Sequence, residues 1–212
     1  MTIASWLLLS LAAVMAVVDW VAVARENAVL EYVSKPAATV ALALFAVSID
    51  VEHTASWAWL VVALVFCLLG DVFLMLPGNR FVPGLASFAV AQVMFAIGFA
   101  VGETSAARWP VAAVIAIPVA SLLARRFVGA IRRSGHPELV VPVSVYVVVI
   151  TMMAVSAVAS GSWVAVAGAI VFMFSDALIA ETRFVKARSW QPVGIMVTYH
   201  LALAGLVLSL LN

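Results

Sequence analysis

Cysteine and histidine, the residues most common at disulfides and zinc centres, are nearly absent from this sequence. Its 212 residues include one cysteine, Cys67, and three histidines, His53, His136 and His200. A lone cysteine forms neither an internal disulfide nor a cysteine-based metal cluster, and the histidines fall in three separate predicted segments. We therefore predict no metal site and no cofactor, and a zinc-dependent hydrolase is not expected.

Charged residues are also scarce. They make up only 10% of the chain, and the net charge at pH 7 is +1, whereas a soluble domain is about 25% charged. No basic stripe is present, so nucleic-acid binding is not expected. Apolar residues account for 67% of the chain and the mean hydropathy is +1.22, more hydrocarbon than a soluble core of this size can bury. The composition therefore predicts an integral, multi-pass membrane protein, which we expect in the cell (inner) membrane.

Long apolar runs are what the sequence has in abundance. Most reach the roughly 20 residues that a helix needs to cross a bilayer, and none alternates like a membrane barrel strand. We therefore predict an all-α fold, a polytopic membrane helical bundle of about eight transmembrane helices, as one domain over residues 1–212. The runs cover residues 3–24, 36–49, 57–76, 81–101, 110–124, 138–159, 162–180 and 193–211.

The ends of these runs carry recognisable signals. No basic residue precedes the run at 3–24, which is long enough to span, so we expect a retained helix there rather than a cleaved signal peptide. Short turn-forming stretches separate later runs, at 77–79 (Pro-Gly-Asn), 134–137 (Ser-Gly-His-Pro) and 160–162 (Ser-Gly-Ser). These stretches predict tight connections between antiparallel helices.

The basic residues predict an orientation, because Lys and Arg are retained on the cytoplasmic side of a membrane. Arg108 lies in an even-numbered connection between runs. The other ten of the eleven lie in the odd-numbered connections: Arg25, Lys35, Arg80, Arg125, Arg126, Arg132, Arg133, Arg183, Lys186 and Arg188. We therefore predict that the odd connections are cytoplasmic and that both termini lie on the outer face.

Two carboxylates, Asp71 and Asp176, stand inside predicted spans, where an ionisable side chain is costly and commonly functional. Both are predicted at a similar depth in the cytoplasmic half, on helices running in the same direction. We expect them to pair, which would leave one as an acid and the other as a base. The alternative is that each is neutral and only holds neighbouring helices together. Asp19, near the inner end of the first helix, is a further candidate in this layer, for which the ordinary interpretation is a pairing with Arg25.

Five further residues are predicted in the same layer, each with two interpretations. Lys35, expected to open the second helix before Pro36, is a substrate-binding candidate or a cytoplasmic anchor. Tyr146 and Tyr199 are candidates for orienting water or ordinary interfacial tyrosines. Arg80 and Arg183 are candidates for binding a phosphate or determinants of topology.

Five short stretches resemble the YhhN-like lysoplasmalogenase family, which consists of multi-spanning membrane alkenyl ether hydrolases. They extend across nearly the whole chain in the family's order, and the paired Gly-Asp and Ser-Asp helices make the set fairly specific. The stretches are residues 33–36 (Val-Ser-Lys-Pro), 69–74 (Leu-Gly-Asp-Val-Phe-Leu), 81–88 (Phe-Val-Pro-Gly-Leu-Ala-Ser-Phe), 146–153 and 168–184.

Three positions depart from the family pattern. Gln92 stands where a histidine is expected, and His200 and Leu203 stand where tyrosine and glutamine are expected. If the missing histidine assists proton transfer in relatives, this chain does without it. The departures predict a difference in activity or in substrate range.

The resemblance implies an alkenylglycerophospho-choline/ethanolamine hydrolase. Such an enzyme cleaves the vinyl-ether bond of a lysoplasmalogen-type lysophospholipid, releasing a fatty aldehyde and a glycerophospho-alcohol. The chemistry needs one protonated carboxylic acid and one carboxylate. Asp71 and Asp176 are the predicted catalytic pair, in an order the sequence leaves open. Lys35, Tyr146, Tyr199, Arg80 and Arg183 are the predicted substrate-binding residues.

Two other functions are compatible with parts of this pattern. A small-molecule or proton-coupled transporter would use the two aspartates as a proton relay, but the outer half of the spans is almost uninterruptedly apolar. A non-catalytic lipid-binding membrane protein is the third possibility. Serine hydrolase and nucleotide-binding functions are not favoured, because the chain has no Gly-x-Ser-x-Gly and no phosphate-binding glycine loop. Headgroup, natural substrate and oligomeric state stay open.

Overall fold

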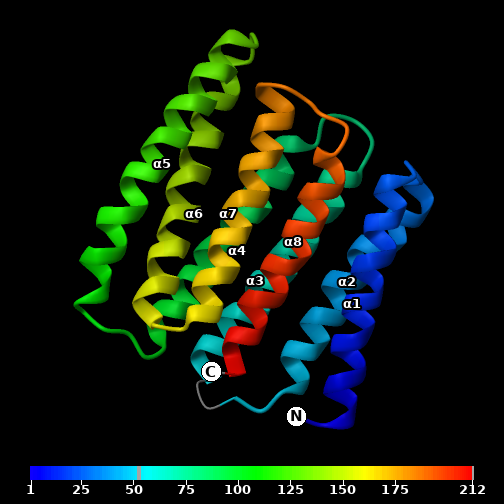
Figure 1. Ribbon diagram of the computed structural model, residues 1–212, viewed down its shortest axis with the longest axis vertical. Helices are drawn as coiled ribbons and strands as arrows, with labels where there is room; N and C mark the ends of the chain where they lie inside the picture. The colour runs from blue at the N-terminus through cyan, green and yellow to red at the C-terminus, as the bar shows by residue number, and fades with distance from the viewer. Residues whose placement is uncertain (52–53, 212) are drawn as a thin grey trace.

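The computed structural model describes residues 1–51 and 54–211, and within them the chain forms eight long α-helices and no strand (Figure 1). All eight are long and apolar enough to cross a membrane, which confirms the predicted fold class and helix number. The helices are α1 (Ile3–Ala24), α2 (Ala28–Ser48), α3 (Thr54–Met75), α4 (Phe81–Val101), α5 (Arg108–Arg133), α6 (Val140–Ser160), α7 (Trp163–Phe184) and α8 (Gln191–Leu208). Short 3-10 segments at Pro137–Leu139 and Ser209–Leu211 flank α6 and α8.

Helix α2 begins eight residues earlier than predicted. The Asn27 side chain accepts a hydrogen bond of 3.1 Å from the Leu30 amide, and Glu31 stands in the first turn, where the helix dipole favours a carboxylate. Lys35 and Pro36 therefore lie inside the helix, and the prediction that they open it was wrong. Charge interrupts an apolar run, but it does not interrupt a well-capped helix.

Helix α5 also extends beyond its predicted end. It continues from the expected limit at residue 124 to Arg133, so Arg125 and Arg126 are helical rather than part of a connection. The Arg126 guanidinium lies 2.7 Å from a carboxylate oxygen of Glu181, which ties this end of α5 to α7. The last turns of α5 are polar but remain helical because their backbone hydrogen bonds continue. Hydropathy depends on side chains alone, so it does not predict this extension.

The predicted tight connections are present at three glycines. Gly78, Gly135 and Gly161 have φ values of 87°, 81° and 80°. Residues with a Cβ adopt this left-handed conformation at a cost, and glycine does not. The chain therefore reverses direction within a few residues at each position.

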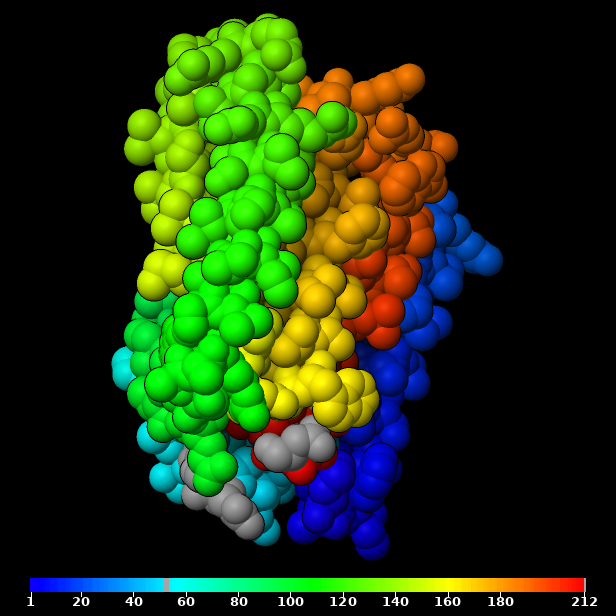
Figure 2. Space-filling view, turned by 60° about the vertical axis from the view of Figure 1, so that its left-hand side comes forward, coloured from blue at the N-terminus to red at the C-terminus, as the bar shows by residue number. Residues whose placement is uncertain are grey.

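Neighbouring helices form a closed ring with α5 outside it. Contacts run from α1 through α2, α3, α4, α6, α7 and α8 back to α1, while α5 packs mainly on α6 and also touches α7. Figure 2 shows α5 standing forward as the outermost helix of that side. Both termini lie at one end of the bundle, opposite the connections that follow α1, α3, α5 and α7 (Figure 1). Which end faces the cytoplasm stays a prediction.

Close packing of α7 on α8 depends on small residues. The Cα of Gly168 lies 3.0 Å from the place where a Cβ on Gly205 would stand, so the two backbones nearly touch. This is how helices associate in lipid, where no hydrophobic force drives them together. It aligns α7, which carries Asp176, with α8, which carries Tyr199.

Candidate active site

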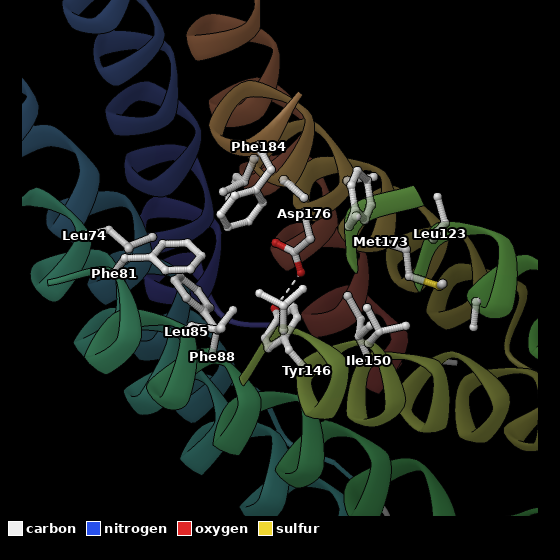
Figure 3. A pocket seen from close by; sticks show the side chains of 17 residues that line it. Leu74, Phe81, Leu85, Phe88, Leu123, Tyr146, Ile150, Met173, Asp176 and Phe184 are labelled. Carbon is white, nitrogen blue, oxygen red and sulfur yellow. Dashed lines mark hydrogen bonds between the residues drawn. The ribbon is translucent and has the colours of Figure 1, made fainter. Parts of the chain in front are cut away.

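Asp176 on α7 faces Tyr146 on α6. The Tyr146 hydroxyl donates a hydrogen bond of 2.5 Å to Asp176 Oδ2. The other carboxylate oxygen has no hydrogen-bond partner within the described chain, and in Figure 3 it points away from Tyr146, toward the side formed by Phe81 and Leu85. One oxygen is therefore held in place while the other faces open space.

That space is an otherwise apolar cavity of about 70 Å³ between α4, α5, α6 and α7 (Figure 3). Asp176 and Tyr146 are the only polar side chains among its lining residues in the part of the chain that the structure describes. Hydrocarbon side chains such as Leu85, Phe127 and Ile150 form the rest of the wall. A volume of this size holds a few water molecules or one end of a larger ligand.

Asp71 on α3 lies in a second, more deeply buried cluster. Its Oδ1 is 3.4 Å from Lys35 Nζ, and its Oδ2 accepts hydrogen bonds of 3.0 Å from Thr39 Oγ1 and 2.7 Å from the Tyr199 hydroxyl. Asp71 is 1% exposed and Lys35 is 4% exposed. A buried pair of this kind is stable only when its partners are all in place.

These positions correct several expectations from the sequence. Lys35 is not a cytoplasmic anchor, because its ammonium is buried against Asp71. Tyr146 and Tyr199 are not interfacial tyrosines, because both are buried and each hydroxyl bonds an aspartate.

The expected direct pairing of Asp71 with Asp176 does not occur. No hydrogen bond or ion pair joins the two carboxylates in residues 1–51 and 54–211, and Asp71 does not line the Asp176 cavity. Phe88 lies between the two clusters: its ring lines the cavity and also packs edge-on against Tyr199, with centroids 5.8 Å apart. Similar depth placed both aspartates in one layer, but their helices present them to different neighbours.

Arg183 marks the end of the cavity nearest the predicted cytoplasmic connections. Its guanidinium lies 4.0 Å from the ring centre of Phe81 and 5.9 Å from that of Phe184, and both rings line the cavity. It also donates a hydrogen bond of 3.0 Å to Asn79 Oδ1. Arg80 is exposed just before α4 and makes no side-chain hydrogen bond or ion pair with the described residues. The structure therefore brings Arg183 to the cavity and leaves Arg80 outside it.

Two further polar residues lie near Asp71 and Lys35. Thr39 was not predicted from the sequence, and Asp19 was predicted with a different partner. Thr39 bonds Asp71 and stands one helical turn after Lys35, a spacing that could have linked the two. Asp19 is fully buried and accepts a hydrogen bond of 3.0 Å from Ser34; it forms no ion pair with Arg25 within the described chain. The expected pairing of Asp19 with Arg25 was therefore wrong.

Gln92 and His200, two of the departures from the family pattern, are both buried. Gln92 lies beside Tyr146, and neither polar atom of its amide has a hydrogen-bond partner in the described chain. His200 Nδ1 accepts a hydrogen bond of 3.0 Å from Trp20 Nε1. Among residues 1–51 and 54–211, no three His, Cys, Asp or Glu side chains gather as a metal site would require, and His53 lies outside the described residues.

The eight membrane-length helices define a polytopic membrane protein. Its interior holds a buried ion pair and, separately, an apolar cavity that bears a carboxylate. The chain belongs to the YhhN family, whose sequence model matches residues 30–210. This confirms the resemblance seen in the five short stretches. No solved structure matches the chain.

Curated relatives carry a specific name. The chain is 33% identical over 183 residues to proteins named "Lysoplasmalogenase" from Mycobacterium bovis and Mycobacterium tuberculosis, covering 83% of this chain and 68% of each relative. It is 29% identical over 153 residues to human "Lysoplasmalogenase TMEM86B", covering 71% of this chain and 62% of that protein. The similarity therefore extends over most of this chain and about two thirds of each relative.

Proposed function

We propose that this protein is a lysoplasmalogenase-type ether hydrolase. It cleaves the vinyl-ether bond of a lysoplasmalogen-type lysophospholipid to a fatty aldehyde and a glycerophospho-alcohol, in the cell (inner) membrane. The observation that carries the proposal is the Asp176 carboxyl, which faces an apolar cavity with one oxygen fixed by Tyr146 and the other free. The relatives named lysoplasmalogenase support the same reaction.

The reaction needs an acid in an apolar place. Cleavage begins when a proton is transferred to the β-carbon of the vinyl ether, which leaves an oxocarbenium ion at the carbon bonded to oxygen. Water adds to that carbon and loses a proton, and the resulting hemiacetal breaks into aldehyde and alcohol. One water molecule is consumed, and the proton given in the first step is recovered in the later ones.

Asp176 is the residue we assign as the acid. Its free oxygen points into the cavity, where a vinyl ether would lie, and the Tyr146 hydroxyl fixes the orientation of the carboxyl group. After proton transfer, the carboxylate stabilises the oxocarbenium ion and accepts the proton of the attacking water. This follows the acid-and-base logic of glycosidases, with one carboxyl doing both steps.

Asp71 we assign as a positioning residue. It is held by Lys35, Thr39 and Tyr199, and the Phe88 ring stands between this cluster and the cavity. A carboxylate in that place fixes Tyr199, and through it the ring of Phe88 that forms the cavity wall. It reaches the substrate only through these neighbours.

We assign Arg183 as the residue that binds the phosphate of the lipid. It stacks on two rings at the cavity's edge and keeps further donors free for an anion. Asp176 and Arg183 are about two helical turns apart on α7, roughly 10 Å along the helix axis. That separation suits a substrate whose phosphate lies at the membrane surface and whose ether bond lies deeper.

Transport is not favoured by the packing of the outer half. A cavity of about 650 Å³ at the end of the bundle nearest the termini reaches Leu60 and Gly98, but the side chains of Leu64, Phe95 and Met153, which lie deeper in that half of α3, α4 and α6, are fully buried. A proton-coupled transporter needs water to reach its carboxylates from both sides. The closely packed layer of hydrocarbon leaves no such route among these residues.

The test is an aldehyde-release assay on the purified, detergent-solubilised protein with a lysoplasmalogen. Asp176→Asn is expected to reduce aldehyde release to background, because the acid is removed while shape is retained. Asp71→Asn is expected to lower kcat with little change in KM, since Asp71 is buried behind the wall. Asp50→Asn, at an exposed site beyond α2, is the matched control and should retain full activity. Wild-type activity in Asp176→Asn would refute the mechanism, and wild-type protein without activity would refute the proposed function.

A further inference from the structure

A long apolar groove runs along the outside of the bundle between α4, α5 and α6. Its volume is about 680 Å³, far larger than the Asp176 cavity. It exists because α5 packs mainly on α6 and because alanines face the hollow. These alanines are Ala96 and Ala100 on α4 and Ala113, Ala120 and Ala124 on α5.

The groove presents hydrocarbon to whatever occupies it. None of its described lining residues is charged. Three of the four lining hydroxyls, those of Ser144, Thr151 and Ser156, donate to backbone carbonyls of their own helix at 2.7, 2.6 and 2.9 Å, and only the Ser121 hydroxyl makes no hydrogen bond within the described chain. Since most of these donors are already used, the surface offers few contacts to a polar ligand and suits an alkyl chain.

The groove and the Asp176 cavity share part of their wall. Ala120 of α5 and Val147 of α6 line both of them. The groove therefore lies against the cavity at Val147, the residue after Tyr146, and it extends past this point to Ala124 of α5 and Ser144 of α6. For a ligand whose reactive end lies at Asp176, this groove is the adjacent apolar space for the rest of the molecule.

The part of the groove between Ala120 and its far end matches one lipid chain in length. From Ala120 to Trp109, which lines its far end, α5 rises by roughly 16 Å at 1.5 Å per residue. One leaflet, half of a hydrocarbon core about 30 Å thick, has nearly the same depth. A lysophospholipid has a single chain, so one groove of this length is sufficient for it.

We propose that this groove binds the hydrocarbon chain of the lysophospholipid, with the vinyl ether at Asp176 and the chain end at Trp109. This inference rests on the proposed function and deepens it, because it makes the groove the determinant of chain-length preference. The occupant is one substrate chain. Annular lipid and a second copy of the protein are the alternatives that the experiment addresses.

The first experiment compares long-chain and short-chain lysoplasmalogens. Ala113→Trp fills the groove near its far end, and it is expected to lower kcat/KM for the long chain by about tenfold or more relative to the short chain. Val114→Trp is the matched control: it lies on the same helix, is 73% exposed and does not line the groove. Its long-to-short ratio should stay at the wild-type value. An unchanged ratio in Ala113→Trp would overturn the inference.

A second experiment separates failure of this inference from failure of the proposed function. A lysophospholipid with a photoreactive diazirine at its chain end is cross-linked to the protein and the attachment sites are mapped by mass spectrometry. Cross-links concentrated at Trp109 and Ala113 support the groove even if no aldehyde is ever released. Cross-links spread over lipid-facing positions such as Val114 and Leu122 would show annular lipid and overturn it. So would a dimer in lipid bilayers whose interface covers Ala113.

Discussion

The Lys35 ammonium lies 3.4 Å from Asp71 Oδ1 in a part of the bundle where both side chains are almost completely buried. Lys35 on α2 and Asp71 on α3 thus compensate each other's charge in the interior, where neither charge would be stable alone. Removing one partner of such a pair is more costly than replacing both, because the remaining charge is left without compensation.

Lys35→Met is expected to lower the free energy of unfolding by about 3–5 kcal/mol. The double variant Lys35→Met with Asp71→Asn should lose clearly less than this, because no charge remains in the apolar surroundings. Denaturant unfolding in detergent micelles measures both values. Lys186→Met, at an exposed site after α7, is the control and should be nearly neutral. A double variant as unstable as the single one would contradict the ion pair.

Tyr146→Phe removes the hydroxyl that fixes Asp176. A hydrogen bond to a charged group contributes about 1.5–3 kcal/mol, which corresponds to a decrease in kcat of roughly tenfold to a hundredfold. KM should change little, because the ring and the cavity shape are retained. Tyr32→Phe is the matched control. The Tyr32 hydroxyl donates a hydrogen bond of 2.7 Å to the Met75 carbonyl at an exposed site, and its removal should leave kcat unchanged. Equal rates in Tyr146→Phe and wild type would remove Tyr146 from the site.

Arg183→Ala is expected to raise KM for the lysophospholipid, because it removes the cation at the edge of the cavity. If the phosphate contact is made equally in the ground and transition states, kcat stays near its wild-type value. Arg80→Ala provides the comparison, since Arg80 is exposed and has no side-chain partner among the described residues. Steady-state kinetics on both variants measure KM and kcat separately. A larger KM effect for Arg80 than for Arg183 would reverse the assignment.

Gly168→Ala tests the close approach of α7 and α8. An added Cβ would lie 2.8 Å from the Leu206 amide nitrogen, which is backbone and cannot move aside. We expect a loss of about 1–3 kcal/mol in the free energy of unfolding, typical of overpacking. Gly129→Ala on α5 is the matched control, because its Cβ would meet only the flexible end of the Arg133 side chain at 3.3 Å. Alanine is the better helix former, so that control should be neutral or stabilising.

The positions of the helices were predictable because hydropathy depends on local composition. Each of the eight apolar runs became a helix, and the turns at Gly78, Gly135 and Gly161 followed from the glycines themselves. The ends of α2 and α5 were not predictable in this way. Polar residues such as Glu31 and Arg126 end an apolar run, yet a helix continues through them when caps and ion pairs satisfy them.

Asp71 and Asp176 are recognisable from the sequence as candidate functional residues, because an ionisable group within an apolar span is costly wherever the fold places it. Their partners depend on the packing of the helices, which the sequence pattern does not reveal. Position along a helix sets depth in the membrane, but the rotation of each helix and the identity of its neighbours set which side chains meet. That is why two carboxylates at similar depth are separated by Phe88, one bound to Lys35 and the other facing a cavity beside Tyr146.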